Sequence, residues 1–244
     1  APQTVSDDAP ETGAFMDFAH LTRLQRFLRE TRTLLRATDP AMPHGSNVFM
    51  ANMPRGLLYA LGGDHAVQVW YRDSTLSFRH YADHRAHPEV AVRHVLQYQP
   101  DLTPELVLVP AEAMELQDRA FVDITTNRHA EAIALLARAD SIASDPRLQV
   151  FHGESAGVRA YALDMLDRVA EAETEARRSV GDFRLCFNGR LVLATTLLAR
   201  GKPNEALPFI ESLQRTHPRN AAVARLFREY QRQSGTSGSA LATP

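Results

Sequence analysis

The chain has 244 residues, of which 44% are hydrophobic and 23% are charged, and its formal net charge at pH 7 is −2. This length allows one large or two small globular domains, and the charge balance gives no sign of the basic patch that a nucleic-acid partner requires. No apolar run approaches the ~18 residues of a spanning helix, so we expect no membrane insertion by this segment.

Pro, Ser, Gly and Thr are frequent at both ends of the chain, which predicts a linker at 1–13 and a flexible tail at 234–244. The first residue is Ala1 and not Met, which favours a piece cut from a longer protein. Between these ends, apolar side chains recur at helical spacing over 14–37, and this pattern predicts an amphipathic helix. Pro40 ends it, because proline disfavours a helical conformation in the residue before it.

The segment 45–110 has a different character and indicates a small sheet with a helix against it. PRGLLYALGG at 54–63 is typical of a helical turn ended by two glycines, whereas its neighbours alternate or are rich in β-branched residues. The predicted strands lie at 46–53, 65–72, 75–81, 91–99 and 105–110. We therefore predict a small α/β module over 14–110.

From 111 onward helical patterns follow one another, and an internal repeat emerges. In LVLATTLLARGKPNEALPFIESLQRTHPRN, Ala194 lies in a first helix, Gly201 ends that helix, and Ala206 lies early in a second. Small alanines let two helix axes approach closely, and glycine adopts the helix-ending conformation that a side chain opposes. One repeat length of 34 residues earlier, which is the distance from Ala160 to Ala194, the matching places hold the same residue types. These earlier residues are Ala160, Leu163 and Ala172.

The offsets resemble the tetratricopeptide repeat (TPR), a pair of antiparallel helices with a glycine at the turn. The resemblance covers roughly 111–233 and implies an array of such pairs with a capping helix at 221–233. A weaker first unit surrounds Ala132 and needs an insertion of about six residues, which 144–153 can hold. Two departures from the family are that Arg190 replaces a large aromatic residue and that the middle unit lacks the turn glycine. The predicted fold class is α+β, a small N-terminal α/β module followed by a C-terminal all-α TPR-like array.

The stretch GESAG at 153–157 matches G-x-S-x-G, the nucleophile-elbow pattern of serine hydrolases. In such an enzyme a strand precedes Ser155, and an acid and then a histidine follow it. The only later histidine is His217, beside Pro218 in the turn that ends the repeat. In the repeat interpretation Ser155 caps or flanks a helix start, and we predict that it is not a nucleophile. A serine hydrolase that uses Ser155 is the alternative function.

Histidines cluster between the predicted strands, within fifteen residues of the chain. They are His80, His84, His87 and His94. Imidazole is the commonest protein ligand of several metal ions, so the cluster raises a metal-site hypothesis. The spacing fits no familiar zinc pattern, and no HExxH motif accompanies it. We therefore interpret the cluster as a solvated loop and predict no metal and no cofactor.

In the TPR family the first helices of the pairs form a concave face that commonly binds peptides. The resemblance places seven residues of the last two units on that face: Val158, Tyr161, Asp164, Met165, Asn188, Val192 and Thr195. Asparagine and tyrosine side chains can bond a peptide backbone or carboxylate. The predicted partner-binding residues are Tyr161, Asp164, Asn188 and Thr195, and we predict no catalytic residue and no metal ligand.

The resulting hypothesis is a non-catalytic protein-interaction or scaffold domain, excised from a larger bacterial protein. Its partner is a protein, a peptide or another domain of the same chain. The sequence leaves the compartment open, although similar bacterial repeat segments favour an extracytoplasmic domain of a membrane-associated protein.

Overall fold

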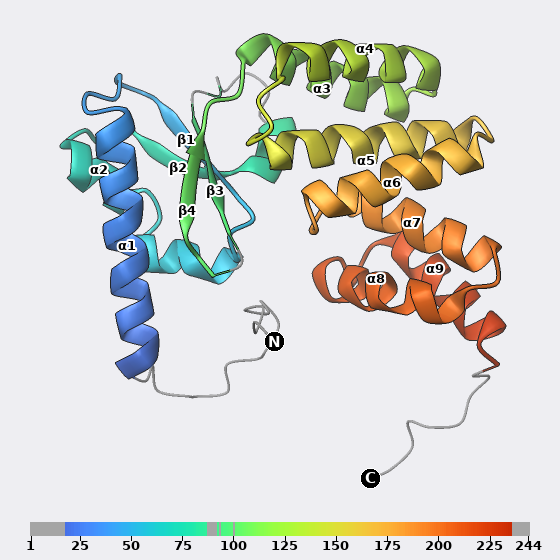
Figure 1. Ribbon diagram of the computed structural model, residues 1–244. Helices are drawn as coiled ribbons and strands as arrows, with labels where there is room; N and C mark the ends of the chain where they lie inside the picture. Colours follow the sequence, from blue (N-terminus) through green and yellow to red (C-terminus); the bar gives the residue numbers. More distant parts are fainter. Residues whose placement is uncertain (1–17, 87–91, 93, 100, 236–244) are drawn as a thin grey trace. The chain divides into compact units, whose positions relative to one another are not determined.

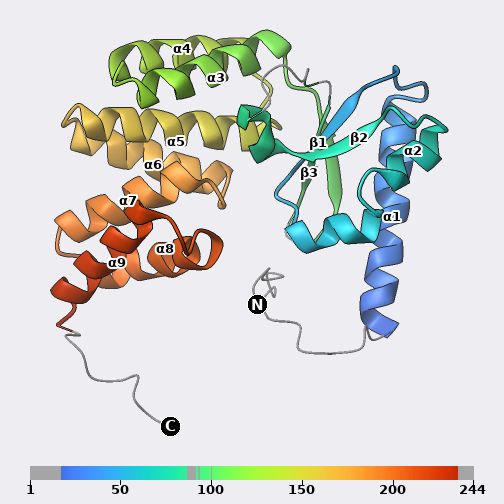
Figure 2. The ribbon, with the colours of Figure 1, turned by 180° about the vertical axis from the view of Figure 1, so that it is seen from behind.

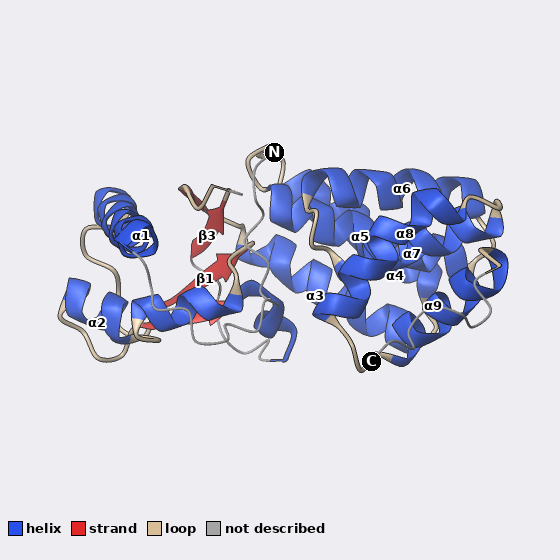
Figure 3. Cartoon of the chain, turned by 90° about the horizontal axis from the view of Figure 1, so that it is seen from below, coloured by secondary structure: helices blue, strands red, loops and turns tan. Residues whose placement is uncertain are grey.

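The computed structural model describes residues 18–86, 92, 94–99 and 101–235, and the chain divides into two compact units (Figure 1). The first, which we call the sheet unit, runs to Asp118 and includes Ser141–Val150. The second, the helix unit, holds Arg119–Asp140 and continues from Phe151. Strands in one unit and stacked helices in the other confirm the predicted α+β class (Figure 3). None of the described helices combines the length and the apolarity that a membrane span requires.

The sheet unit contains one sheet with the strand order β2-β1-β3-β4. Its strands are β1 (Asn47–Ala51), β2 (Ser77–His80), β3 (His94–Tyr98) and β4 (Pro104–Val107). β1 is parallel to both β2 and β3, with Val48 opposite Phe78 and Phe49 opposite Val95, whereas β3 and β4 are antiparallel. The central strands β1 and β3 are buried along almost their whole length, as is usual for parallel strands that are covered on both faces.

Helix α1 (Phe18–Thr38) carries the apolar face that the sequence predicts, and residues 14–17 of that prediction lie outside the described part. Phe27 and Leu35 are buried in the same core as strand residues such as Tyr98. The rings of Phe27 and Tyr98 lie 5.0 Å apart, and the Tyr98 hydroxyl is 3.2 Å from Oγ1 of Thr31. This contact satisfies the phenol inside the core, where an unbonded polar group would be costly.

The prediction of a strand at 65–72 is wrong, because this segment forms the helix α2 (His65–Tyr71). It follows the 3-10 helix η1 (Arg55–Leu61), which ends as predicted at left-handed Gly62. The chain must cross over between the parallel strands β1 and β2, and such a connection usually contains a helix. Alternation would have placed Val67 and Val69 on one face, but in the helix Val67 is buried and Val69 is 72% exposed.

From α3 onward the helices form a stack of antiparallel pairs (Figures 1 and 2), which makes up the helix unit except that the start of α3, the end of α4 and the first two residues of α5 are counted with the sheet unit. The pairs are α3 (Ala111–Thr125) with α4 (His129–Ile142), α5 (Gln149–Met165) with α6 (Val169–Asp182), and α7 (Phe187–Ala199) with α8 (Pro203–Thr216), followed by α9 (Ala221–Gln233). The small residues predicted at the close helix crossings are buried in the cores of these pairs and have no exposed surface. They are Ala132, Ala160, Ala172, Ala194 and Ala206.

One turn geometry recurs between the two helices of each pair. Asn127, Asp167 and Gly201 have positive φ angles of 60°, 57° and 69°. The residue after each of them donates its backbone N–H to a carbonyl five residues earlier, at 2.8, 2.9 and 2.9 Å, which is the helix-ending bond pattern of a left-handed cap. The middle unit therefore keeps the turn without the glycine, because asparagine and aspartate tolerate the left-handed conformation better than other residues with side chains.

The expected insertion at 144–153 takes the form of an extra helical turn. The residue that matches Phe187, the first of α7, is Gly153 at the repeat distance of 34, but α5 already begins at Gln149. The four additional residues extend α5 by about one turn. The rest of the insertion lies in the connection that precedes α5.

Candidate functional site

The GESAG stretch lies inside helix α5 and not at a strand-to-helix turn. Ser155 is completely buried six residues after Gln149, the first residue of the helix, so the prediction that it caps or flanks a helix start is wrong. No strand precedes it in the described connection after α4. His217 follows α8, where its ring packs against Phe187 at 4.7 Å. The elbow geometry that an exposed nucleophile requires is therefore not formed around Ser155.

The two glycines of the stretch are helix-contact residues. A Cβ atom on Gly153 would lie 2.4 Å from Cβ of Phe183, and one on Gly157 would lie 2.5 Å from Sγ of Cys186. Ser179 of α6 donates its hydroxyl to the Gly153 carbonyl at 2.6 Å. The motif thus forms a seam where α5 meets α6 and the start of α7.

A groove with a volume of about 420 Å³ lies along α5, α7 and α9. We call it the array groove. Its lining residues are Tyr161, Asp164, Leu191, Val192, Thr195, Leu198, Ala199, Ala222, Arg225, Leu226, Glu229 and Gln233. On each helix they follow the three- and four-residue spacing that places side chains on one face.

Three of the four predicted partner-binding residues line the array groove, namely Tyr161, Asp164 and Thr195. The fourth, Asn188, does not line it and is 9% exposed in the first turn of α7. It shares the helical stripe of Thr195 but lies two turns nearer to the start of α7, where neighbouring side chains bury it. Of the further family positions, Val192 also lines the groove, and Val158 is fully buried in the core.

Helix α9 contributes five residues of the array groove, although the sequence analysis treated it only as a cap. A signal was present, because Ala222, Arg225, Leu226 and Glu229 recur at helical spacing within a strongly amphipathic segment. The adjoining face of the same helix, about 100° around the axis from Ala222, buries Val223 in the core. Sequence reasoning could therefore have assigned α9 two contact faces.

Polar groups of both charges border the array groove. Burial, and secondarily the charge of Asp167, raises the pKa of the Asp164 carboxyl above its ordinary value of 3.8. Arg232 and Gln233 donate hydrogen bonds to Glu229, which lower the pKa of that carboxyl. The hydroxyl of Thr195 donates to the Leu191 carbonyl at 2.9 Å, so its oxygen is available to a ligand mainly as an acceptor. Asp164 is thus the half-buried anion of the groove whose charge is not offset.

We expect Asp164→Asn to raise the stability of the free protein at neutral pH by no more than about 0.5 kcal/mol, since solvent screens a half-exposed charge. A raised native pKa means that the native state binds this proton more tightly than the unfolded state does. The stability that protonation gives is therefore complete below pH 3.8 and is lost as the pH rises through the native pKa. Urea unfolding is measured from pH 3 to 7. The difference in the free energy of unfolding between Asp164→Asn and the wild type should shrink at low pH, and a difference that does not change with pH would contradict the prediction.

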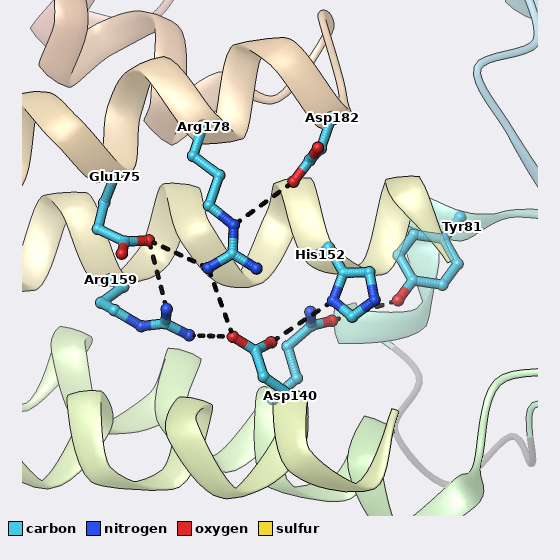
Figure 4. A network of polar contacts seen from close by, with 8 residues as sticks. Tyr81, Asp140, His152, Arg159, Glu175, Arg178 and Asp182 are labelled. Atoms are coloured by element: carbon cyan, nitrogen blue, oxygen red, sulfur yellow. Dashed lines mark hydrogen bonds and ion pairs between the residues drawn. The ribbon is translucent and has the colours of Figure 1, made fainter. Parts of the chain in front are cut away.

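A separate ion cluster joins α4, α5 and α6 (Figure 4). Arg159 donates to Asp140 at 2.5 Å and to Glu175 at 3.3 Å, and Nε of Arg178 lies 3.6 Å from Asp182. Burial acts to raise the pKa of Asp140, but the His152 ring, whose Nδ1 lies 3.7 Å from Oδ1, and the hydrogen bond and charge of Arg159 outweigh it and lower that pKa. Because each of its two arginines and three carboxylates contacts an oppositely charged partner within the cluster, it stabilises the helix stack.

The interpretation of the histidine cluster as a solvated loop is wrong, because its described members lie in different surroundings of the sheet unit and two of them are buried. His84 is buried with Nδ1 2.8 Å from Oδ2 of Asp118, and His94 has Nε2 2.9 Å from Oδ2 of Asp39. His80 ends β2, and His87 lies outside the described residues. No group of metal-binding side chains gathers within the described part of the chain.

No family model matches the sequence, and no curated protein matches it. The solved structures that are similar to about half of the chain include three TPR domains. The first TPR of Spaghetti (RPAP3) bound to the HSP90 peptide SRMEEVD is 19% identical, with a TM-score of 0.44, over 51% of this chain and 96% of that one. The first TPR domain of human RPAP3 is 19% identical, with a TM-score of 0.43, over 51% of this chain and 94% of that one. The TPR2B domain of yeast Sti1, in a pHsp70 complex, is 15% identical, with a TM-score of 0.42, over 52% of this chain and 99% of that one.

The helix unit is a TPR-like array, as the sequence predicts. Its own geometry carries this conclusion, because three helix pairs share one turn at Asn127, Asp167 and Gly201 and bury alanines at matching positions.

Proposed function

We propose that this chain is a non-catalytic protein-interaction module whose array groove binds a peptide segment. The observation that carries the proposal is that α5, α7 and α9 each turn one face toward the same groove. Apolar side chains such as Val192 and Leu226 form its floor, while Tyr161, Asp164 and Thr195 supply hydrogen-bonding groups along it. A groove of this kind suits an extended or helical peptide, which presents a row of anchors and backbone groups.

A small-molecule ligand fits the array groove less well. Small-molecule sites are usually concave cavities that enclose most of the ligand and hold only a few convergent polar groups. The array groove instead runs along helices with charged residues from α5 and α9 at its border. Because the groove is short, we expect weak and transient binding unless other surfaces contribute.

The occupant in this proposal is a partner protein or another part of the same polypeptide. The net charge of −2 argues against a nucleic acid. The sequence resemblance to bacterial TPR segments supports the further proposal that the chain belongs to a larger, membrane-associated bacterial protein and lies outside the cytoplasm.

The experiment uses two threonines in matched surroundings. Thr195 in the array groove and Thr174 on α6 are both exposed, and each donates its hydroxyl to the carbonyl four residues earlier at 2.9 Å. Peptides are first selected against the full chain from a phage-displayed random library. Thr195→Arg should weaken the selected peptides about tenfold or more, because a long cation fills the groove, whereas Thr174→Arg should leave their affinity unchanged.

Circular dichroism and thermal melting establish that both variants fold before the affinities are compared. Equal binding by the two variants would show that the peptides dock elsewhere, and the proposal would then be rejected. A selection that yields no binding peptide at all would also count against it.

A further inference from the structure

The sheet unit carries a second groove, with a volume of about 690 Å³, along helix α1. We call it the arginine groove. Arg29, Arg32 and Arg36 of α1 line it together with Ala66 and Trp70 of α2. None of the described residues that line it is acidic. Three cations therefore share one hollow without a carboxylate in its wall.

The spacing of the three arginines places them along one stripe of α1. They are separated by three and four residues, the spacings that bring helical side chains onto a common face, and Arg29 and Arg36 lie about 10 Å apart along the axis. All three are exposed. The neighbouring carboxylate of Glu30 lies 3.3 Å from Nε of Arg26, an arginine that does not line the groove.

The arginines differ in how far they are held in place. Arg36 donates from Nη1 to the Pro40 carbonyl at 2.9 Å, and its guanidinium lies 4.8 Å from the centre of the Tyr71 ring. This fixes one cation at the end of the groove. Arg29 and Arg32 make no side-chain hydrogen bond or ion pair within the described part of the chain. Like charges held close together without anions repel one another, and a bound anionic group would relieve that repulsion.

The floor of the arginine groove is apolar. Trp70 is partly buried and meets Phe78 edge-to-face at 6.1 Å, and Ala60 and Ala66 lie beside it. An aromatic surface flanked by guanidinium groups contacts an apolar side chain and a nearby carboxylate at the same time. The complementary ligand therefore carries both features in a short stretch.

We propose that the arginine groove binds an acidic peptide segment of a partner protein, with carboxylates on Arg29 and Arg32 and an apolar side chain against Trp70. The forked guanidinium matches a carboxylate with two parallel hydrogen bonds. A nucleic acid is the less suitable polyanion, because the groove spans only about 10 Å and the whole chain is net negative. It shares no lining residue with the array groove, so in this proposal the chain holds two ligands and acts as a scaffold.

Trp70 makes the test local, since it is the only tryptophan in the chain. The probe is a short fluorescein-labelled peptide of repeated Glu-Glu-Leu, titrated with the full chain and followed by anisotropy. Titration of the unlabelled peptide should change the tryptophan emission at the same concentrations. Repeated Gln-Gln-Leu and an oligothymidylate of similar length are the uncharged and nucleic-acid controls. Added salt should weaken the binding of the acidic peptide, because interactions between exposed charges are screened.

Two matched double variants distinguish binding in the arginine groove from general electrostatic attraction to helix α1. The double substitution Arg29→Gln and Arg32→Gln should lower the affinity for the acidic peptide about tenfold or more, because two charge-assisted contacts are lost. Arg23→Gln with Arg26→Gln lowers the charge of the same helix by the same amount, at the same spacing and outside the groove, and should change binding less than twofold. Equal weakening by both doubles, an unchanged tryptophan emission, or tighter binding of the oligothymidylate would each overturn the proposal.

Discussion

Gly157→Ala should destabilise the protein by about 3 kcal/mol, at the upper end of the usual cost of overpacking a core. The added methyl carbon would lie 2.5 Å from Sγ of Cys186, 2.9 Å from Oγ of Ser179 and 3.0 Å from the backbone nitrogen of Gly189. A side chain can rotate away, but the Gly189 backbone belongs to helix α7 and moves only if the helix moves. The three contacts come from two further helices and the residue before α7, so relief at one of them tightens another.

Gly181→Ala is the control for this substitution. Gly181 lies in the last turn of α6, and a Cβ atom there would meet nothing within 4 Å. Alanine is the better helix former, so this variant should gain about 0.5–1 kcal/mol. Urea unfolding midpoints of the two variants should therefore move in opposite directions from that of the wild type. A loss at Gly157 no larger than the effect at Gly181 would show that the α5 seam is loosely packed.

The same seam explains why the sequence suggested a hydrolase. Gly153 and Gly157 are separated by four residues, which places them on one face of a helix. Small residues at this spacing also serve close helix contacts, so G-x-S-x-G is ambiguous until the surrounding secondary structure is known. In this chain the preceding segment continues the helix back to Gln149, and that context decides between the two interpretations.

The repeat was predictable because its signal is local. Buried alanines and a left-handed turn residue recur at nearly fixed distances, and both follow from the contact between two adjacent helices. The helix at 65–71 was not predictable from its own residues, since Val67 and Val69 alternate as in a strand. What decides its structure is the crossover between β1 and β2, a connection that only the sheet topology reveals.

The residues of the two grooves likewise divide into those that local spacing predicts and those that only the tertiary structure reveals. Tyr161, Asp164 and Thr195 could be placed from the repeat offsets, because these fix which helix face each residue occupies. Asn188 satisfies the same offset but is buried by neighbours at the start of α7, which no offset records. The arginine groove was not foreseen, because Trp70 enters it from α2, in the segment expected to be a strand.

Arg190 is a residue for which the sequence departs from its family and the structure supplies a reason. It replaces the large aromatic side chain expected there and is 2% exposed. Its guanidinium donates to Ser212 Oγ at 2.6 Å, to the Leu185 carbonyl at 2.7 Å and to the Cys186 carbonyl at 3.2 Å. Burial lowers the pKa of Arg190, but an arginine remains charged at neutral pH. The side chain thus ties α7 to α8 and to the connection that precedes α7.

Arg190→Ala should cost about 3 kcal/mol, because it opens a cavity and leaves the Leu185 carbonyl and Ser212 without this donor. Arg190→Met retains most of the volume but none of the hydrogen bonds, so its cost should be about half as large if packing and bonding contribute comparably. The matched control is Arg215→Ala on the exposed surface of α8, which should change stability by less than about 0.5 kcal/mol. Urea unfolding of the three variants measures the order. If Arg190→Met is as unstable as Arg190→Ala, the stabilising role belongs to the hydrogen bonds alone. If Arg190→Ala loses no more stability than Arg215→Ala, Arg190 does not stabilise the core.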